Sequence, residues 1–320
     1  MSRRTGPRRH CRPVRQRRFF LHRKSLLRYG GPPGEKRMVA MGSYREFAAE
    51  LALEAGRFLK GKFNTAHDIT YKGEIDLVTE ADRGCEALLI DRIEKAFPDH
   101  GILAEETRGA ALDREFLWII DPLDGTTNYA HHYPVFCVSI ALQKRGEVIA
   151  GAICNPMLEE LFLAGKGTGA FLNGQRLAVS STAELTRSLL STGFPYDIRV
   201  NPDNNLNYFS ALAVQAQAIR RAGAAALDLA YVAAGRFDGF WELKLHPWDT
   251  AAGCLMVTEA GGKVTDLFGG PFDLYSPHVL ATNGRIHEAM SEILRSTDPM
   301  DARLTGARIK EKGRIERKTL

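Results

Sequence analysis

Two aspartates stand three residues apart behind an apolar stretch, and carboxylate oxygens are the ligands that hard cations prefer. Asp121 and Asp124 follow the apolar residues 118–120 and precede Gly125. The backbone carbonyl of Leu123, between the two acids, offers a further oxygen ligand. A glycine at position 125 lets the backbone approach a ligand closely. A β-turn capped by aspartate would show the same sequence, so this segment alone leaves a cation site and a plain turn both open.

Thr126 and Thr127 come next and predict the first turn of a helix. The first N–H groups of a helix have no partner inside the helix, and they suit the oxygens of a phosphate group. The segment therefore favours a site where a phosphate ester is held beside cations.

Further acids stand at the ends of other predicted elements. Glu105 and Glu106 end a short strand, Asp249 precedes an apolar helix, and Asp82 lies in the opening turn of another helix. Each has a simpler explanation: the glutamates as a solvated pair, Asp249 as an N-cap, and Asp82 as part of a helix start. If these segments converge, acids from distant parts of the chain would surround the same cations.

The first half of the chain predicts two helices followed by a set of short strands. The spacing of apolar residues indicates helices at 44–60 and 79–97. Tight turns at 145–147 and 173–174 join neighbouring strands as hairpins, so the sheet of this half is expected to be largely antiparallel. The expected strands cover residues 102–104, 116–120, 136–143, 148–154, 161–164, 170–172 and 175–179.

The second half alternates strands with helices, which favours an α/β layer. The expected strands are 188–192, 240–243 and 279–282, and the expected helices are 205–221, 225–235, 249–260 and 285–295. No linker interrupts the body, so residues 41–184 and 185–296 are expected to form two lobes that share an interface.

Over residues 43–296 the chain resembles the inositol monophosphatase family. The resemblance is carried by the block W-x-x-D-P-x-D-G-T-x-N at 118–128 and by a second block, W-D-x-A-A-G at 248–253 with E-A-G-G at 259–262. It implies a layered αβαβα sandwich, with a largely antiparallel N-terminal sheet lobe and a mixed α/β C-terminal lobe, as in inositol monophosphatase and fructose-1,6-bisphosphatase. It also implies hydrolysis dependent on two to three Mg²⁺ ions, lithium sensitivity and a homodimer.

The resemblance also assigns roles to single residues, with most metal ligands in the first lobe. The metal ligands that it implies are Glu105, Asp121 as a bridge, the Leu123 carbonyl, Asp124 and Asp249. The catalytic residues that it implies are Glu105, Asp82 and Thr126, the last two orienting the attacking water. The substrate contacts that it implies are Asp124, Gly125, Thr126, Ala225, Glu242 and Asp249. Ala224 departs from the family pattern, since many relatives have Ser or Thr there, and Lys72 lies one residue from the spacing of a mobile-loop lysine.

The chemistry that these residues imply follows from charge. A phosphomonoester is anionic and repels an anionic nucleophile, whereas bound cations neutralise the phosphate and acidify a bound water. Inositol 1-phosphate is the first substrate candidate. Fructose-1,6-bisphosphatase, histidinol-phosphatase and 3′(2′),5′-bisphosphate nucleotidase activities are the alternatives within the class.

Charge is distributed unevenly along the chain. Residues 1–38 contain 13 Lys and Arg against one acid, whereas the whole chain has a net charge of only +5, so the body is acidic. Residues 1–40 are expected to be disordered, with Met38 and Met41 as alternative starts, and 297–320 to form a charged tail. The basic segment leaves open a non-enzymatic alternative, an RNA-associated binding protein.

Other features favour a cytoplasmic protein without a membrane span. No apolar run reaches the roughly 18 residues that a span requires, and the five cysteines include no C-x-x-C pair. A disulfide framework or zinc site is therefore not expected. The glycine-rich residues 165–169 lack the spacing of a phosphate loop and predict a hairpin turn. Arg220 and Arg221 are expected at a helix end, or in contact with substrate or a partner subunit.

Overall fold

The computed structural model describes residues 41–63, 69–71, 77–107 and 113–297. The described residues all belong to one compact unit of the chain. The predicted basic extension, Lys72 and the tail from residue 298 on lie outside the described residues. None of the described helices is long and apolar enough to cross a membrane.

The larger sheet has seven strands in the order β3-β4-β5-β6-β7-β8-β9. Only β3 and β4 are parallel, and the other pairs are antiparallel, so the expected hairpin sheet is confirmed. Its strands are β3 (Gly101–Ala104), β4 (Phe116–Asp124), β5 (Cys137–Lys144), β6 (Glu147–Asn155), β7 (Glu160–Gly165), β8 (Gly169–Leu172) and β9 (Gln175–Arg176). The turn between β8 and β9 has positive φ at Asn173 and Gly174, 48° and 79°, as a two-residue hairpin turn requires.

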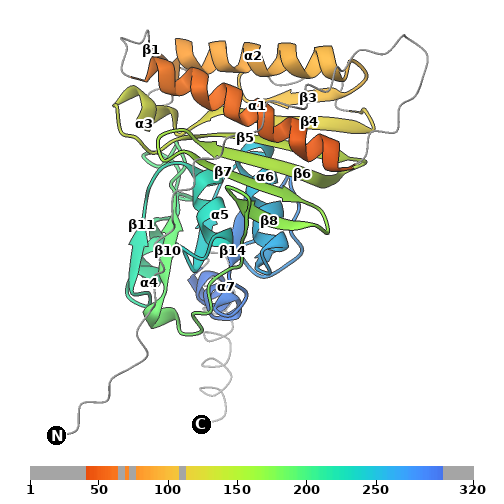
Figure 1. Cartoon of the computed structure of the whole chain (residues 1–320). Helices are drawn as coiled ribbons and strands as arrows, with labels where there is room; N and C mark the ends of the chain where they lie inside the picture. The colour runs from red at the N-terminus through yellow and green to blue at the C-terminus, as the bar shows by residue number, and fades with distance from the viewer. Residues whose placement is uncertain (1–40, 64–68, 72–76, 108–112, 298–320) are drawn as a thin grey trace, which may run out of the picture. The chain divides into compact units, whose positions relative to one another are not determined.

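Two helices, α1 (Met41–Lys62) and α2 (Glu80–Ala96), cover one face of this sheet (Figure 1). Leu51 of α1 and Leu89 of α2 are fully buried in the same core as Trp118 of β4. Burying each such side chain stabilises the fold by roughly 1.5–3 kcal/mol. The hairpin of β1 (Ile69–Tyr71) and β2 (Leu77–Thr79) precedes α2 and was not predicted.

The smaller sheet has five strands in the order β11-β10-β12-β14-β13. β10 is parallel to β11 and β12, whereas β14 is antiparallel to β12 and β13, so this sheet is mixed as expected. Its strands are β10 (Leu189–Thr192), β11 (Ala218–Arg220), β12 (Gly239–Glu242), β13 (Lys263–Thr265) and β14 (Val279–Thr282).

Four helices complete the layers. α5 (Ala225–Ala233) and α6 (Pro247–Glu259) lie between the two sheets, and α4 (Leu206–Ala213) and α7 (His287–Thr297) lie on the far side of the smaller sheet (Figure 1). The order helix, sheet, helix, sheet, helix confirms the predicted αβαβα sandwich. The remaining helical segments are α3 (Thr126–Ala130) and a 3₁₀ turn (Leu185–Arg187).

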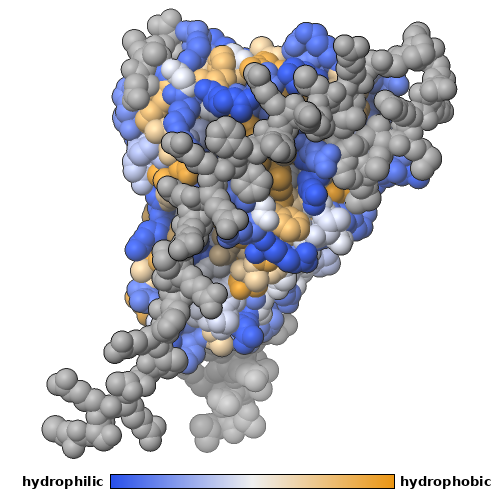
Figure 2. All heavy atoms as spheres, in the orientation of Figure 1, coloured by the Kyte–Doolittle hydropathy of each residue, from blue (hydrophilic) through white to orange (hydrophobic). Residues whose placement is uncertain are grey.

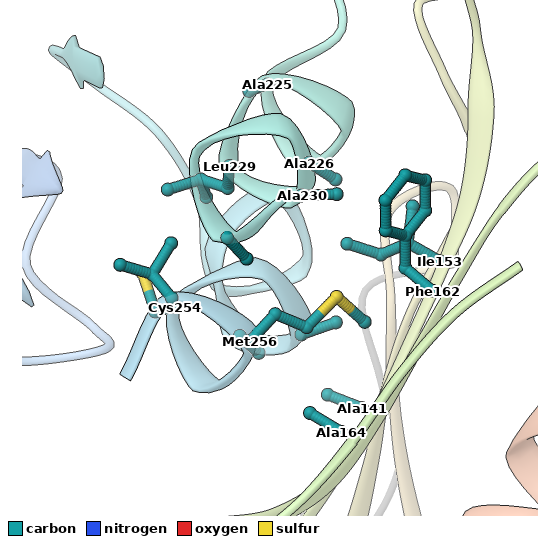
Figure 3. Packing of buried hydrophobic residues seen from close by; sticks show 14 of the residues in the cluster. Ala141, Ile153, Phe162, Ala164, Ala225, Ala226, Leu229, Ala230, Cys254 and Met256 are labelled. Atoms are coloured by element: carbon teal, nitrogen blue, oxygen red, sulfur yellow. The ribbon is translucent and has the colours of Figure 1, made fainter. Parts of the chain in front are cut away.

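Small residues bring the middle helices close together. A Cβ on Gly253 of α6 would lie 2.5 Å from Cβ of Leu229 on α5, so only glycine permits this approach. Figure 3 shows α5 and α6 packed against Ile153 and Phe162 of the larger sheet. This packing fixes the starts of both helices, where candidate site residues lie.

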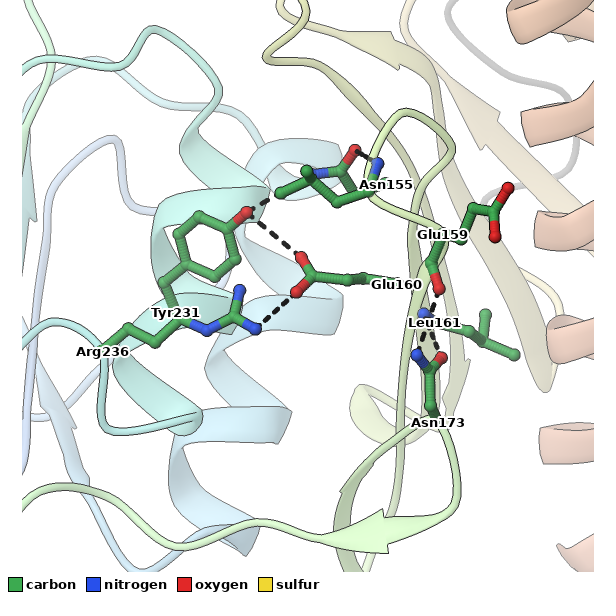
Figure 4. A network of polar contacts seen from close by, with 8 residues as sticks. Asn155, Glu159, Glu160, Leu161, Asn173, Tyr231 and Arg236 are labelled. Carbon is green, nitrogen blue, oxygen red and sulfur yellow. Dashed lines mark hydrogen bonds and ion pairs between the residues drawn. The ribbon is translucent and has the colours of Figure 1, made fainter. Parts of the chain in front are cut away.

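A polar cluster ties α5 and the residues that follow it to the larger sheet (Figure 4). Glu160 of β7 pairs with Arg236 and accepts a hydrogen bond of 3.2 Å from the hydroxyl group of Tyr231. Asn155 donates to the same hydroxyl group at 3.3 Å. Glu160 is only 9% exposed, whereas the Arg236 side chain is 38% exposed, so the pair is shielded on the carboxylate side alone.

The predicted helix 205–221 was wrong in its second half. α4 ends at Ala213, and Ala218–Arg220 form the edge strand β11 beside β10. Backbone pairing with an existing strand outweighs the helical spacing of these residues, and the N–H of Gln217 already donates to the carbonyl of Ser188 at 3.0 Å. Arg220 therefore lies in a strand and not at a helix end.

The surface of the described part is mixed in polarity. On the face that Figure 2 shows, hydrophilic residues predominate and apolar areas are small and scattered. Large apolar side chains that are exposed are Tyr133, Leu158, Tyr196, Val200, Leu206, Val214 and Tyr275.

Candidate functional site

The end of β4 carries two buried carboxylates on one face of the larger sheet. Asp121 pairs with Ser139 of β5 and Asp124 pairs with Cys137. The partners are two positions apart in β5, whereas the aspartates are three positions apart in β4. This bulge keeps both side chains on the same face, because alternate residues of a strand share a face. Asp121 is 2% exposed and Asp124 is 8% exposed.

Gly125 connects this strand end to α3 in a conformation that favours glycine. Its φ is +96°, and a Cβ there would lie 3.0 Å from the carbonyl oxygen of Val135 and 3.3 Å from that of Gly223. The glycine therefore allows the first turn of α3 to begin directly beside Asp124. Asn128 of α3 donates to the carbonyl of Ala222 at 2.8 Å, which links α3 to the segment before α5.

Thr126 lies within hydrogen-bonding distance of two predicted site groups. Its hydroxyl is 2.9 Å from Oδ1 of Asp82 and 3.0 Å from the carbonyl oxygen of Leu123. Asp82 is fully buried in the first turn of α2. The structure thus brings together the threonine and the aspartate that the sequence analysis assigned to water orientation.

Asp124 faces the start of α5. Its Oδ1 accepts from the N–H of Ala225 at 3.1 Å and its Oδ2 from the N–H of Ala226 at 2.8 Å. The carboxylate thereby satisfies N–H groups that have no partner inside the helix. Ala225, a predicted substrate contact, therefore lies beside Asp124, a predicted metal ligand.

Asp249 is the third residue of α6, and the N-cap is His246. Its Oδ2 accepts from the N–H of His246 at 2.7 Å. The simpler explanation of Asp249 as the N-cap was therefore wrong, because the N-cap lies three residues earlier, at His246. Pro247 occupies the first helical position, which suits proline. Ser139 of β5 donates to the carbonyl of Trp248 at 3.2 Å and ties the start of α6 to the sheet.

Four predicted metal ligands influence one another electrostatically. Burial raises the pKa of Asp121 well above its usual range, and the charges of Glu105, Asp124 and Asp249 raise it further. Burial also raises the pKa of Asp249, followed by the charge of Asp124. The pKa of Asp124 is raised to about 6, with burial as the largest cause. These acids come from β3–β4 and α6, which are distant in sequence.

The side chains and the carbonyl present fit a hard cation by their chemistry. Among the described residues, no three His, Cys, Asp or Glu side chains are already close enough to enclose a metal ion. The donors are nevertheless all oxygen atoms, and a divalent cation would compensate for the buried negative charge that raises their pKa values.

Glu242 and Asp228 extend this acidic region between α5 and the smaller sheet. The pKa of Glu242 is raised to about 8 by burial and by Asp124, and Arg221 opposes the shift. The pKa of Asp228, which is 2% exposed on α5, is raised by burial and then by Glu242. Sequence reasoning missed Asp228, although a single acid inside an otherwise apolar helix was a usable signal.

The glycine-rich turn 165–169 is a hairpin connection between β7 and β8, as predicted. Both oxygens of Glu259 accept from it, Oε1 from the N–H of Gly167 and Oε2 from the N–H of Gly169, each at 2.7 Å. A carboxylate of the chain itself therefore uses the N–H groups that a phosphate loop would offer. The four cysteines of the described part are free and buried.

Comparisons with known proteins agree with this fold. The model of the inositol monophosphatase family matches residues 41–298. An inositol-1-monophosphatase of Synechocystis is 47% identical over 257 residues, which cover 80% of this chain and 90% of that protein. The Nus factor SuhB of Escherichia coli K12 is 42% identical over 251 residues, 78% of this chain and 94% of that protein. The solved structure of an inositol monophosphatase from Anabaena is 45% identical with a TM-score of 0.75, covering 82% of this chain and 100% of that one.

Proposed function

Because this chain belongs to the inositol monophosphatase family, a family of phosphatases, we propose that it hydrolyses the phosphomonoester of a small polyol or sugar. Inositol 1-phosphate is the first substrate candidate, since a relative at 47% identity is named an inositol-1-monophosphatase. The observation that carries the proposal is the grouping of Asp121, Asp124 and Asp249 beside the starts of α3 and α5.

Mg²⁺ is the proposed cofactor, in two to three ions. Its ligands would be Glu105, Asp121, the Leu123 carbonyl, Asp124 and Asp249. When bound, such cations neutralise the phosphate and lower the pKa of a coordinated water. Residues of the chain would orient the water, bind the phosphate and bind the hydroxyl groups of the polyol.

Asp82 and Thr126 would orient the attacking water, because the hydroxyl and the carboxylate already lie 2.9 Å apart. The N–H groups of Gly125 and Thr126 would bind phosphate oxygens at the start of α3, where helix N–H groups have no internal partner. Ala225, through its backbone, and Glu242 would then bind the hydroxyl groups of the polyol. No covalent intermediate with the protein is required.

A kinetic panel with Mg²⁺ tests the substrate. Inositol 1-phosphate should give a higher kcat/KM than fructose 1,6-bisphosphate, histidinol phosphate or 3′(2′),5′-bisphosphate nucleotides. A nucleotide bisphosphate turned over far faster than inositol 1-phosphate would show that the substrate assignment is wrong. We further propose inhibition by lithium, a homodimer and a cytoplasmic location, the last supported by the free buried cysteines.

A second candidate function is RNA association, alone or beside catalysis. It is supported by 13 Lys and Arg among residues 1–38, and relatives at 42–47% identity are named Nus factor SuhB and not phosphatase. RNA affinity that falls steeply with salt and is lost on deletion of residues 1–40 would support it. RNA affinity unchanged by that deletion would show that the basic segment does not carry this function.

A further inference from the structure

Gly193 and Glu242 lie opposite each other at the ends of two parallel strands. β10 pairs with β12 so that Ser191 lies opposite Phe240 and Thr192 opposite Trp241. The next step of this register places Gly193, directly after β10, opposite Glu242, the last residue of β12. Residues paired in this way project their side chains to the same face of the sheet, here the face that packs against α5, because Phe240 shares a core with that helix.

The Glu242 carboxylate fills the space that a side chain at position 193 would take. A Cβ on Gly193 would meet Oε1, Cδ and Oε2 of Glu242, all far inside the 3.0 Å below which Cβ contacts essentially never occur. The φ of Gly193 lies outside the positive range that favours glycine, so its backbone conformation suits any residue. The glycine is therefore required for the space it leaves.

Charged groups restrict where the carboxylate can lie. Asp124 and Asp228 repel it from the α5 side, and Arg221 is the cation that opposes them. Arg221 lies over Gly223, just before α5, since a Cβ on that glycine would be 2.9 Å from its Nη1. Asp249 interacts with the same carboxylate, so Glu242 lies among several acids, and Gly193 is where it has room.

We propose that Gly193 is a specificity-determining positioning residue that acts through Glu242. By carrying no side chain, it sets the place at which the Glu242 carboxylate meets the hydroxyl groups of a polyol phosphate. This inference rests on the proposed function, in which Glu242 binds those hydroxyl groups.

Adding a methyl group at position 193 should move the carboxylate and leave the fold intact. The obstructing atoms are the end of a side chain, which can change rotamer without moving the backbone. Gly262 differs, because a Cβ there would lie 2.6 Å from the backbone oxygen of Thr282, which cannot rotate away. Gly193→Ala should therefore change the position of the Glu242 carboxylate without lowering the stability of the fold.

The experiment compares Gly193→Ala with Gly61→Ala, since a Cβ on Gly61 of α1 would have no neighbour within 4 Å. For inositol 1-phosphate, Gly193→Ala should raise KM or lower kcat/KM roughly tenfold or more, as expected when a buried hydrogen-bonding group is misplaced. For p-nitrophenyl phosphate, which has no hydroxyl groups on its ring, kcat/KM should stay within about twofold. Equal kinetics of the two variants on inositol 1-phosphate would overturn the inference.

A double-mutant cycle shows whether the effect passes through Glu242. In a Glu242→Ala background, Gly193→Ala should change kcat/KM for inositol 1-phosphate by less than about twofold. A tenfold further loss in that background would show that Gly193 acts by another route, which contradicts the proposal.

A crystal structure of Gly193→Ala separates this inference from the proposed function. If the wild-type enzyme hydrolyses p-nitrophenyl phosphate and no polyol phosphate, the proposed substrate is wrong. The positioning role is then decided by the structure alone. A carboxylate displaced by about 1 Å or more supports it, and one that keeps its wild-type position beside the new methyl group refutes it.

Discussion

Asp121 is the most enclosed of the acids at the end of β4, and its neighbours repel its charge. Burial together with Glu105, Asp124 and Asp249 raises its pKa well above the usual range. Such an arrangement costs stability in a protein without bound cations, and it is retained where cations are to be held. Asp121 therefore destabilises the cation-free fold, and its proposed value to the protein lies in binding cations.

Asp121→Asn should abolish turnover while the protein stays folded. We expect a fall in kcat on the order of a thousandfold, because cations at such sites contribute several kcal/mol to catalysis. The asparagine oxygen can still accept from the N–H of Leu123, as Oδ1 of Asp121 does at 2.9 Å. Thermal melting in EDTA should show a Tm no lower than that of the wild type, because one buried charge has been removed.

The matched control is Asp203→Asn, since Asp203 is exposed in the segment before α4. It should keep wild-type kcat within about twofold. Near-normal turnover by Asp121→Asn in a Mg²⁺ assay would remove Asp121 from the site.

Thr126 allows the role of a single hydroxyl group to be tested at one position. Thr126→Val removes the group that lies 2.9 Å from Asp82, and kcat should fall roughly a hundredfold if this pair orients the water. Thr126→Ser keeps the hydroxyl and should stay within a fewfold of the wild type. Equal activity of the two variants, measured under saturating substrate, would show that the hydroxyl has no role.

Some site residues were predictable from the sequence and others were not. Asp121 and Asp124 stand in a motif that shows their spacing directly. The position of Gly193 opposite Glu242 depends on the register of two strands separated by nearly fifty residues, which no local pattern reveals. Asp228 was visible as a lone acid in an apolar helix, but its neighbour Glu242 lies across a helix–sheet interface, which the sequence does not show.

At the element scale, turns with special φ values were the most predictable feature. Asn173-Gly174 and Arg145-Gly146 both adopt positive φ at each residue. Asn and Gly favour this conformation, whereas Arg145 adopts it because the tight turn requires it. β11 was mispredicted as helix because its residues also fit helical spacing, and pairing with β10 decided the outcome. Local sequence cannot reveal a strand whose stability comes from a partner far along the chain.

The turn 165–169 gives a prediction about an element that lies outside the proposed site. Glu259→Ala removes the acceptor of two N–H groups, each bonded at 2.7 Å. The free energy of unfolding should fall by about 1–2 kcal/mol, since each partly exposed, charge-assisted bond contributes modestly. Urea unfolding measures this change, and kcat/KM should remain within about twofold of the wild type.

Glu147→Ala is the control for this variant. It breaks an exposed ion pair with Lys166 beside the same turn, and exposed pairs contribute about 0–1 kcal/mol. A large loss of activity in Glu259→Ala, with unchanged stability, would indicate that the turn takes part in function after all.

At the scale of the whole molecule, the site draws on both halves of the chain. Asp82, Asp121 and Asp124 come from the part before residue 184, and Glu242 and Asp249 from the part after it. The sequence predicted two lobes with a shared interface, and that division of the described body stays a prediction. The layers meet where α5 and α6 pack between the two sheets. A change that destabilises either half should therefore also disturb the positions of the site residues at the starts of these helices.

Each half also encloses a histidine that must stay neutral. His100 stacks between Phe97 and Phe116, with 4.7 Å between ring centroids on each side. Its Nδ1 accepts from the indole N–H of Trp118 at 3.0 Å, and an indole N–H can only donate. Burial lowers the pKa of His100 to about 4, and burial together with Lys263 lowers the pKa of His287 to about 4.

These two histidines should make the fold less stable in acid. Their pKa values in the folded protein lie below the value of about 6.5 expected in the unfolded chain, so the unfolded chain binds more protons between pH 6.5 and 4. Stability from each histidine is therefore complete above about pH 6.5 and is lost as the pH falls toward 4. The loss is on the order of 1–3 kcal/mol for each and smaller for His100, because solvent screens a partly exposed group.

His100→Gln and His287→Gln measure this contribution, because glutamine does not titrate and can still accept a hydrogen bond. Acids of the site have raised pKa values and act in the opposite direction, since they bind protons more readily in the folded state. The wild-type curve alone therefore mixes both effects. The informative quantity is the difference in the free energy of urea unfolding between wild type and variant, which should shrink by about 1–3 kcal/mol from pH 7 to pH 4.5. A difference that stays constant over this range would show that the histidine already titrates normally in the folded protein.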